Sequence, residues 1–317
     1  MKRKILLIFA LLIIALNYNI IEAQENNDIT RLGVMKFSSR AEGVSDKQAE
    51  AIGDMFARML ANSKSIIVVE RDRFEDLAKE HKFAQSGRFE DDEVIKLGKL
   101  ISCKYILLGS VTNLVKDTKT TDLWLVSETR QEVTVTIDVR VVDVETSKVI
   151  YTFSQEGSAS EKGSGFNFYG FKTKNNDFTG IEMSAVSDAV SRAIFKIRET
   201  FGNEYVQIIN ITAKEITINA GENWGINPGM LFQVYSEGRE IINLDGTSMG
   251  KKITLLAILK IVESQKDFST AQVIKNGGRA SSLRKGNKLQ PITQKEAEKL
   301  IKQKFFSRGS NNEKKKK

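Results

Sequence analysis

The side chains that most often perform chemistry in proteins are scarce in this sequence. Its 317 residues include one histidine, His81, and one cysteine, Cys103. Zinc sites, iron–sulfur clusters and disulfide-stapled domains each need several such side chains. His81 lies within the charged run 79–82, which favours a surface position over a ligand or a base. Cys103 lies between apolar pairs, which favours a buried, inert thiol.

Three short motifs could carry chemistry, and each has a simpler structural explanation. Glu70-Arg71 could bind a ligand, but it is also a typical ion pair at the end of a strand. Asp91–Glu93 could hold a metal, but acidic residues are common at helix starts because of the helix dipole. Gly163-Ser164-Gly165 lacks the lysine and the following helix of a phosphate-binding loop. The sequence therefore predicts no catalytic residue, no cofactor and no metal site.

The net charge of +8 is concentrated at the two ends of the chain. Residues 1–23 carry +2, and residues 290–317 hold nine basic and three acidic side chains, which is +6. The chain between these ends is neutral. Phosphate binding needs a basic surface on the folded part of a protein, so this distribution argues against a nucleic-acid partner.

Residues 1–23 have the three-part layout of a secretory signal peptide. A basic start, Met1–Lys4, precedes an unbroken apolar run of twelve residues, Ile5–Leu16, and the small Ala23 stands at the expected cleavage position. An uncleaved membrane anchor is the alternative. A twelve-residue helix spans about 18 Å, short of the ~30 Å hydrocarbon core, which favours cleavage and export.

The elements that would position any site fall into two groups, and the first predicts an α/β (α+β) domain over residues 30–200. A capping box at Ser45–Gln48 begins a helix, and Ile66–Val69 is a β-branched run typical of a buried strand. Residues 133–141 alternate apolar with polar side chains, as in a strand with one buried face. Apolar residues at helical spacing over 186–197 predict a closing helix. Together they predict a mixed sheet flanked by helices.

The second group predicts a small all-β, barrel-like domain over residues 203–292. Short apolar runs are separated there by turn residues such as Asn227-Pro228-Gly229 and Asp245-Gly246. Residues 293–317 follow as a basic tail, mostly disordered, in which 295–306 could form a short helix.

Five short motifs follow one another between residues 68 and 150. They are Val68–Arg71, Ala84–Gly87, Leu97–Leu100, Leu107–Val111 and the strand–turn–strand Val139–Ile150. In this order they resemble the CsgG family, named for the outer-membrane curli secretion channel. The resemblance covers most of residues 31–200, and it assigns structural roles to Glu70, Arg71, Ser86, Gly87, Gly98, Gly109 and Ser110.

Within the second domain, three segments carry a looser resemblance. They are Gly221–Gly229, Leu231–Tyr235 and Asp245–Gly250. The module they form is similar to one at the end of the flagellar assembly protein FlgT, which implies a role in protein–protein assembly.

The CsgG resemblance implies a ring-shaped oligomer in which each subunit gives two β-hairpins to a shared membrane barrel. In this chain the corresponding loops are Thr112–Gln131 and Gln155–Gly180. A membrane-spanning strand needs about 9–11 residues of alternating polarity. The first loop is largely polar and the second alternates over only a few positions, which favours a periplasmic protein over a pore.

Five aromatic residues in these two loops are candidate interface residues. Exposed aromatic clusters mark contacts with a membrane, a neighbouring subunit or a partner. The alternative is a flap folded onto its own domain. The candidates are Trp124, Phe166, Phe168, Tyr169 and Phe171.

The sequence thus predicts an exported, non-enzymatic envelope protein that oligomerises or scaffolds the assembly or secretion of a surface structure. Its expected location is the periplasm, with association with the outer membrane as an open alternative. Its expected partners are copies of itself and envelope, secretion or appendage proteins. The alternatives are an outer-membrane secretion channel that forms a ring-shaped β-barrel oligomer and, third, a periplasmic enzyme.

Overall fold

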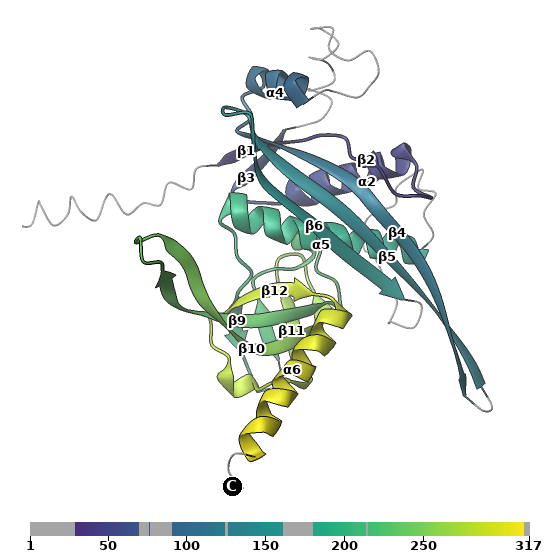
Figure 1. Ribbon diagram of the computed structural model, residues 1–317, viewed down its shortest axis with the longest axis vertical. Coiled ribbons are helices and arrows are strands. Elements are labelled where there is room, and N and C mark those ends of the chain that lie inside the picture. The colour runs from purple at the N-terminus through teal and green to yellow at the C-terminus, as the bar shows by residue number, and fades with distance from the viewer. Residues whose placement is uncertain are drawn as a thin grey trace, which may run out of the picture.

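The computed structural model describes residues 29–69, 76, 91–123, 126–160, 180–213 and 215–313 (Figure 1). Residues 1–23, which carry the predicted signal peptide, lie outside the described residues. Within the part of the chain that the structure describes, no helix has both the length and the apolar character needed to cross a membrane.

The first half of the described chain forms a mixed six-stranded sheet with helices on both faces. Its strands are β1 (Thr30–Val34), β2 (Ser38–Ser39), β3 (Ile66–Val69), β4 (Tyr105–Leu123), β5 (Val126–Asp143) and β6 (Lys148–Ser160). Its helices are α2 (Asp46–Leu60), α4 (Asp91–Leu100) and α5 (Gly180–Gly202). The strand order is β3-β1-β4-β5-β6, with β2 paired to β4. Parallel β1–β3 and β1–β4 pairs and antiparallel β4–β5 and β5–β6 pairs make the sheet mixed, which confirms the predicted fold class.

Helices α2 and α5 cover one face of this sheet and enclose its main core. The predicted capping box begins α2: Ser45 Oγ accepts a bond from the Gln48 N–H at 3.2 Å, and the Gln48 side chain accepts one from the Ser45 N–H at 2.8 Å. The predicted alternation of β5 is also confirmed, because every second residue is at most 3% exposed: Val133, Val135, Ile137, Val139 and Val141.

Close contacts on this face of the sheet explain two glycines. A Cβ at Gly157 of β6 would lie 2.1 Å from the backbone nitrogen of Ala189 in α5. A Cβ at Gly109 would lie 2.2 Å from the Phe37 ring, on the same face of the sheet. These positions leave no space for a side chain.

Helix α4 covers the opposite face, over a smaller core. A Cβ at Gly98 would lie 2.5 Å from the Ile106 side chain, so the helix needs glycine there. The thiol of Cys103 belongs to this core and is 6% exposed. Burial raises its pKa to about 11, partly offset by Arg31, which agrees with the predicted inert thiol.

Strands β4 and β5 continue as a hairpin beyond the end of their neighbour β6 (Figure 1). The β5–β6 pairing ends at Glu132 and Ser160. The β4–β5 pairing continues from Thr118 with Gln131 to Leu123 with Val126. The first of the two predicted loops, Thr112–Gln131, therefore extends these two strands.

A second, antiparallel sheet follows α5. Its strands are β7 (Ile208–Ile211), β8 (Ile216–Ile218), β9 (Leu231–Ile242), β10 (Ser248–Ser264), β11 (Ser269–Gly278) and β12 (Lys288–Ile292), with the 3-10 turns η1 (Glu222–Trp224) and η2 (Ala280–Ser282). The strand order is β12-β9-β10-β11-β8-β7. The sheet curls so that its two end strands meet at an isolated bridge between Gln207 and Lys288. This confirms the predicted all-β class, although the ladder does not close into a continuous barrel.

Two features of this second half extend past the sheet. The β9–β10 hairpin projects to one side of the molecule (Figure 1). Helix α6 (Gln294–Glu313) follows β12. The sequence allows a short helix over 295–306 and predicts disorder from residue 307, whereas the helix in the structure runs on to Glu313. The polar sequence after residue 306 gives no apolar period that would signal this continuation.

Candidate functional site

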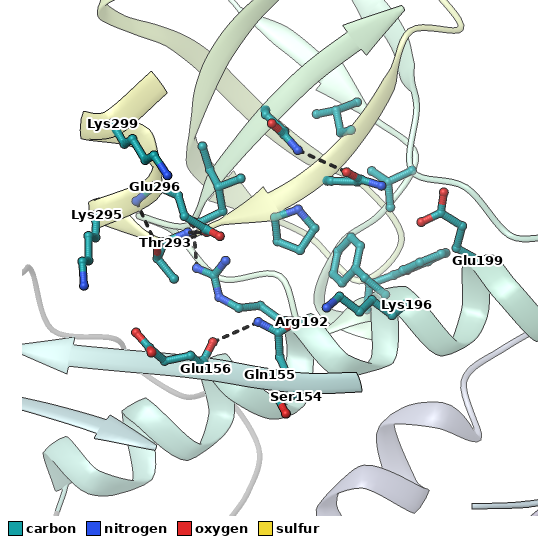
Figure 2. Close-up of a pocket in the computed structure, with 18 of the residues that line it drawn as sticks. Ser154, Gln155, Glu156, Arg192, Lys196, Glu199, Thr293, Lys295, Glu296 and Lys299 are labelled. Carbon is teal, nitrogen blue, oxygen red and sulfur yellow. Dashed lines mark hydrogen bonds between the residues drawn. The ribbon is translucent and has the colours of Figure 1, made fainter. Parts of the chain in front are cut away.

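A cleft of about 890 Å³ lies where α5 and β6 face the second sheet (Figure 2). Helix α5 and the middle of β6 form one wall, and β12, β9 and the start of α6 form the other. The cleft therefore exists only because two segments about a hundred residues apart in sequence pack together.

Arg192, Lys196 and Glu199 line the cleft from α5, at the four- and three-residue spacing that places side chains on one helix face. Arg192 is 5% exposed, and its guanidinium group has hydrogen-bond partners within the protein. Its Nε donates to Asp188 Oδ1 at 2.9 Å, and one of its terminal nitrogens donates to the Ile292 carbonyl at 2.8 Å. This arginine fastens α5 to the end of β12.

Lys196 lies on the same wall and contacts an aromatic ring. Its Nζ lies 4.9 Å from the centre of the Phe153 ring. Among the described residues, no carboxylate lies within ion-pairing distance of Lys196. Burial lowers the pKa of this lysine, and the more distant Glu296 opposes that shift.

A second capping box positions the opposite rim. The Thr293 N–H donates to Glu296 Oε2 at 2.7 Å, and the Glu296 N–H donates to Thr293 Oγ1 at 3.1 Å, so α6 begins at a fixed place beside β12. Figure 2 shows Lys295 and Lys299 on this first part of α6, above the cleft. Lys302 continues the same lining.

The wall formed by β9 and β12 is polar at its centre. Gln233 donates to Gln290 at 3.1 Å across these two strands. Glu199 faces them, and burial raises the pKa of its carboxyl, while the Gln290 side chain and Lys288 oppose the shift. Apolar side chains complete the lining: Phe195, Trp224, Leu289 and Pro291.

Arg198 locks the two halves together beside the cleft. It is 1% exposed, and its guanidinium lies 3.6 Å from the centre of the Trp224 ring. Its Nε donates to Glu204 Oε2 at 2.7 Å, and its terminal nitrogens donate to the carbonyls of Asn223 and Asn62 at 3.2 and 3.4 Å.

Glu204 extends the hydrogen-bond network of Arg198 to the turn after α2. One carboxylate oxygen accepts bonds from the Ser63 hydroxyl at 2.5 Å and from the backbone N–H groups of Lys64 and Ser65 at 2.7 and 2.8 Å. Burial alone would raise the pKa of Glu204, but these bonds and Arg198 together hold it below its ordinary value.

A glycine, Gly225, allows the two halves to pack closely at this junction. Gly225 follows η1 with φ +71°, and a Cβ there would lie 2.1 Å from the Met59 side chain and 2.5 Å from the Ser191 hydroxyl. Ser191 donates to the Gly225 carbonyl at 3.1 Å. The turn that begins the second half thus packs against both α2 and α5.

The cleft has the composition of a binding site. An apolar base of aromatic and aliphatic side chains lies beneath lysines, and two of its carboxylates have structural partners: Glu204 pairs with Arg198, and Glu296 caps α6. No cluster of three or more histidine, cysteine or acidic side chains able to hold a metal occurs among the described residues. The lining holds five acidic and five basic side chains, so it favours no ligand of one charge sign.

The residues singled out in the sequence lie elsewhere or outside the described residues. Gly98, Gly109 and Ser110 lie in the first half, away from the cleft. All five aromatic candidates and four of the motif residues fall outside the described structure or its described side chains: Trp124, Phe166, Phe168, Tyr169, Phe171, Glu70, Arg71, Ser86 and Gly87. His81 does as well.

The apolar spacing that predicts α5 does not single out its basic residues Arg192, Lys196 and Arg198, of which the first two line the cleft. A signal was present, because three basic residues fall within the seven positions 192–198, where the other four are apolar. Long basic side chains in such a helix need either buried partners or a polar opening.

Comparisons with known proteins identify one family. The family model described as "Curli production assembly/transport component CsgG" matches residues 17–222. The comparison with curated proteins found no match. The resemblance of 203–292 to the flagellar assembly module stays a prediction, because the family match ends at residue 222.

Solved structures with a similar arrangement are distant. The LpoB C-terminal domain from Salmonella enterica shares 13% identity, covers 44% of this chain and 90% of its own, and gives a TM-score of 0.31. The hypothetical protein CT253 from Chlamydia trachomatis shares 14%, covers 55% and 97%, and gives 0.35. Lipoprotein GNA1162 from Neisseria meningitidis shares 16%, covers 54% and 99%, and gives 0.32. Scores this low carry no inference about function.

Proposed function

The chain belongs to the CsgG family, and on that premise we propose that it is an exported, non-enzymatic envelope protein that oligomerises to assemble or transport a component of a surface structure. Its place of action is the periplasm, in contact with the outer membrane. Its proposed organisation is an α/β assembly domain over 30–200 and a β domain over 203–292.

The observation that carries this proposal is the β4–β5 hairpin. Residues 118–123 and 126–131 of the two strands pair only with each other among the described residues, beyond the last residue of β6. A two-stranded hairpin alone is marginally stable in water. Its outer edges also offer unpaired backbone groups to another strand. Neighbouring copies that adjoin both strands satisfy these groups and stabilise the hairpin.

A secretion channel is the second candidate, and the length of this hairpin favours it. Residues Thr112–Leu123 form twelve residues of continuous strand, and about 9–11 suffice to span a membrane. In that case the hairpins of a ring of copies line the pore.

The native mass of the protein, extracted gently from the envelope, tests both candidates. Light scattering with and without detergent is the measurement. An oligomer that forms without detergent supports the periplasmic assembly protein, and a ring that requires detergent supports the channel. A monomer under both conditions contradicts the proposed oligomer.

A further inference from the structure

One stretch of the second half, residues 268–295, carries six basic side chains and no acidic one. The chain between its two ends sums to zero only because acidic side chains elsewhere balance this stretch. Two of the six cations have contacts of their own: Lys288 pairs with Glu237 and lies over the Tyr205 ring, and Lys295 lines the cleft. The other four lie within eleven residues and are Lys275, Arg279, Arg284 and Lys285.

We define the basic turn as residues 275–285, which lead from the end of β11 toward β12. All four of its cations are exposed. Among the described residues, no carboxylate lies within ion-pairing distance of any of them. The acidic residues nearest in sequence are bonded elsewhere, since Asp267 accepts a bond from Asn223 at 3.1 Å and Glu296 caps α6. The basic turn therefore carries positive charge that no ion pair compensates.

Hydrogen bonds and one buried side chain fix the backbone of the basic turn. Leu283 is 2% exposed and belongs to the core of the second sheet. The Arg279 carbonyl accepts bonds from the Ser282 N–H at 3.1 Å and from the Ser282 hydroxyl at 2.7 Å. The Gly286 N–H donates to the Ile208 carbonyl at 2.8 Å. The cations thus start from an ordered backbone, which lowers the entropy cost of gathering them on a ligand.

Arg284 differs from the other three cations because its side chain also supports the turn. Its Nη1 donates to the carbonyls of Ser281 and Leu283 at 2.8 and 2.7 Å. These carbonyl oxygens orient the guanidinium without neutralising its charge. The other three side chains have no such bond among the described residues, so they can be changed without loss of a support.

Uncompensated cations on an exposed surface select an anionic partner. The excess of positive charge continues beyond the turn, since residues 275–317 hold fourteen basic and three acidic side chains. An extended anionic surface suits this distribution better than a single small anion. Residues 269–304 contain no aromatic side chain on which bases could stack, which argues against single-stranded nucleic acid. A membrane leaflet with anionic headgroups meets these conditions and lies at the proposed place of action.

We propose that the basic turn docks on an anionic membrane leaflet, where its four cations bind the phosphate groups of lipid headgroups. Each basic side chain close to such a surface strengthens binding roughly fivefold. Salt screens this attraction, so the binding falls as ionic strength rises. The inference rests on the proposed location in the envelope and is independent of the proposed oligomer.

Co-sedimentation of the full chain with vesicles tests the docking. The probes are vesicles of phosphatidylcholine alone and vesicles of phosphatidylcholine mixed equally with phosphatidylglycerol. We expect the mixed vesicles to bind the protein more tightly by about tenfold or more at low salt, and added sodium chloride to reduce the difference. Both kinds of vesicle have the same apolar interior, so insertion of an apolar segment contributes equally to both. Equal binding to the two overturns the inference.

A matched pair of triple variants tests whether the basic turn is the docking site. The first variant removes three charges of the turn and keeps Arg284: Lys275→Gln, Arg279→Gln and Lys285→Gln. The control removes three exposed lysines of the first half: Lys47→Gln, Lys64→Gln and Lys99→Gln. We expect the first to weaken binding to the mixed vesicles by about tenfold or more, and the control to stay within about twofold of the wild type. Equal losses in both variants, or no loss in the first, overturn the basic turn as the site.

Two soluble anions distinguish the leaflet from other sources of phosphate. Inorganic phosphate is expected to displace the protein from mixed vesicles no better than chloride at equal ionic strength, and stronger displacement would indicate a site for a single phosphate and overturn the docking. Binding to a short DNA duplex without binding to the mixed vesicles would overturn the membrane in favour of nucleic acid. An oligomer that ignores anionic vesicles leaves the proposed function standing, whereas a monomer that binds them overturns the oligomer alone.

Discussion

Helix α5 separates two contrasting regions, a packed junction at Arg198 and an open cleft at Lys196. The two residues are two positions apart, so their side chains leave the helix in different directions. Arg198 is 1% exposed and bonded to Glu204 and to two backbone carbonyls. Lys196 contacts the face of Phe153 and stands in the cleft. Two basic side chains of one helix thus have different surroundings: Arg198 joins the two halves, and Lys196 lines an open cleft.

Among the variants that test this contrast, Arg198→Leu is expected to lower the free energy of unfolding the most. It leaves the half-buried Glu204 without its cation, and loss of one partner of a buried pair costs about 3–5 kcal/mol. We expect the free energy of unfolding, measured by urea titration, to fall by about that amount. Lys196→Leu is the matched control and is expected to change it by less than about 1 kcal/mol. Equal losses for the two variants would contradict the distinction.

The tight packing of the junction predicts the next largest effect. Gly225 and Gly246 both have positive φ, +71° and +85°, but a Cβ at Gly246 meets no atom within 4 Å. Gly225→Ala adds a clash with Met59 and Ser191 to the backbone strain that both variants share. We expect it to lower the free energy of unfolding by about 1–3 kcal/mol more than Gly246→Ala does. Thermal and urea unfolding of the two variants measure this difference.

The carboxylates of Glu204 and Glu199 are expected to make the stability of the two regions depend on pH in opposite ways. Hydrogen bonds and Arg198 lower the folded pKa of Glu204, so its contribution to stability is present above the unfolded value of about 4.3 and is lost as pH falls through the folded pKa. Burial raises the folded pKa of Glu199, so its contribution is present at low pH and is lost as pH rises through the folded pKa.

The corresponding variants should therefore respond in opposite senses. Glu204→Gln is expected to destabilise the protein at neutral pH, and Glu199→Gln to stabilise it slightly. Both differences from the wild type shrink on acidification, as each carboxylate takes up its proton. Unfolding titrations from pH 3 to pH 8 measure them, and slopes of the same sign would refute the contrast.

The smallest expected change in stability belongs to Lys196→Met. Burial of this ammonium group lowers its pKa, so an isosteric apolar side chain leaves the free energy of unfolding within about 0.5 kcal/mol of the wild type or slightly above it. A large loss of stability would instead give Lys196 the structural role assigned to Arg198.

The sequence by itself determined most of the elements. The Ser45–Gln48 capping box, the β-branched run Ile66–Val69 and the alternation along 133–141 all predict what the structure contains. The family resemblance, carried by short motifs, is confirmed by the match over residues 17–222. These features are local, because capping, strand alternation and helical spacing depend on residues close together in the chain.

Only the tertiary structure decided the site. The bond from Arg192 to the Ile292 carbonyl and the ring of Trp224 beneath Arg198 join residues far apart in sequence. The spacing of apolar and polar residues along the chain does not reveal which distant residues will meet. The burial of Arg198 and the position of Lys196 in the cleft therefore could not be predicted from the sequence. The exposure of Leu244 is of the same kind, because an apolar residue in a turn looks alike whether a neighbouring segment covers it or not. Packing between distant segments made the cleft, and the absence of such packing among the described residues leaves Leu244 exposed.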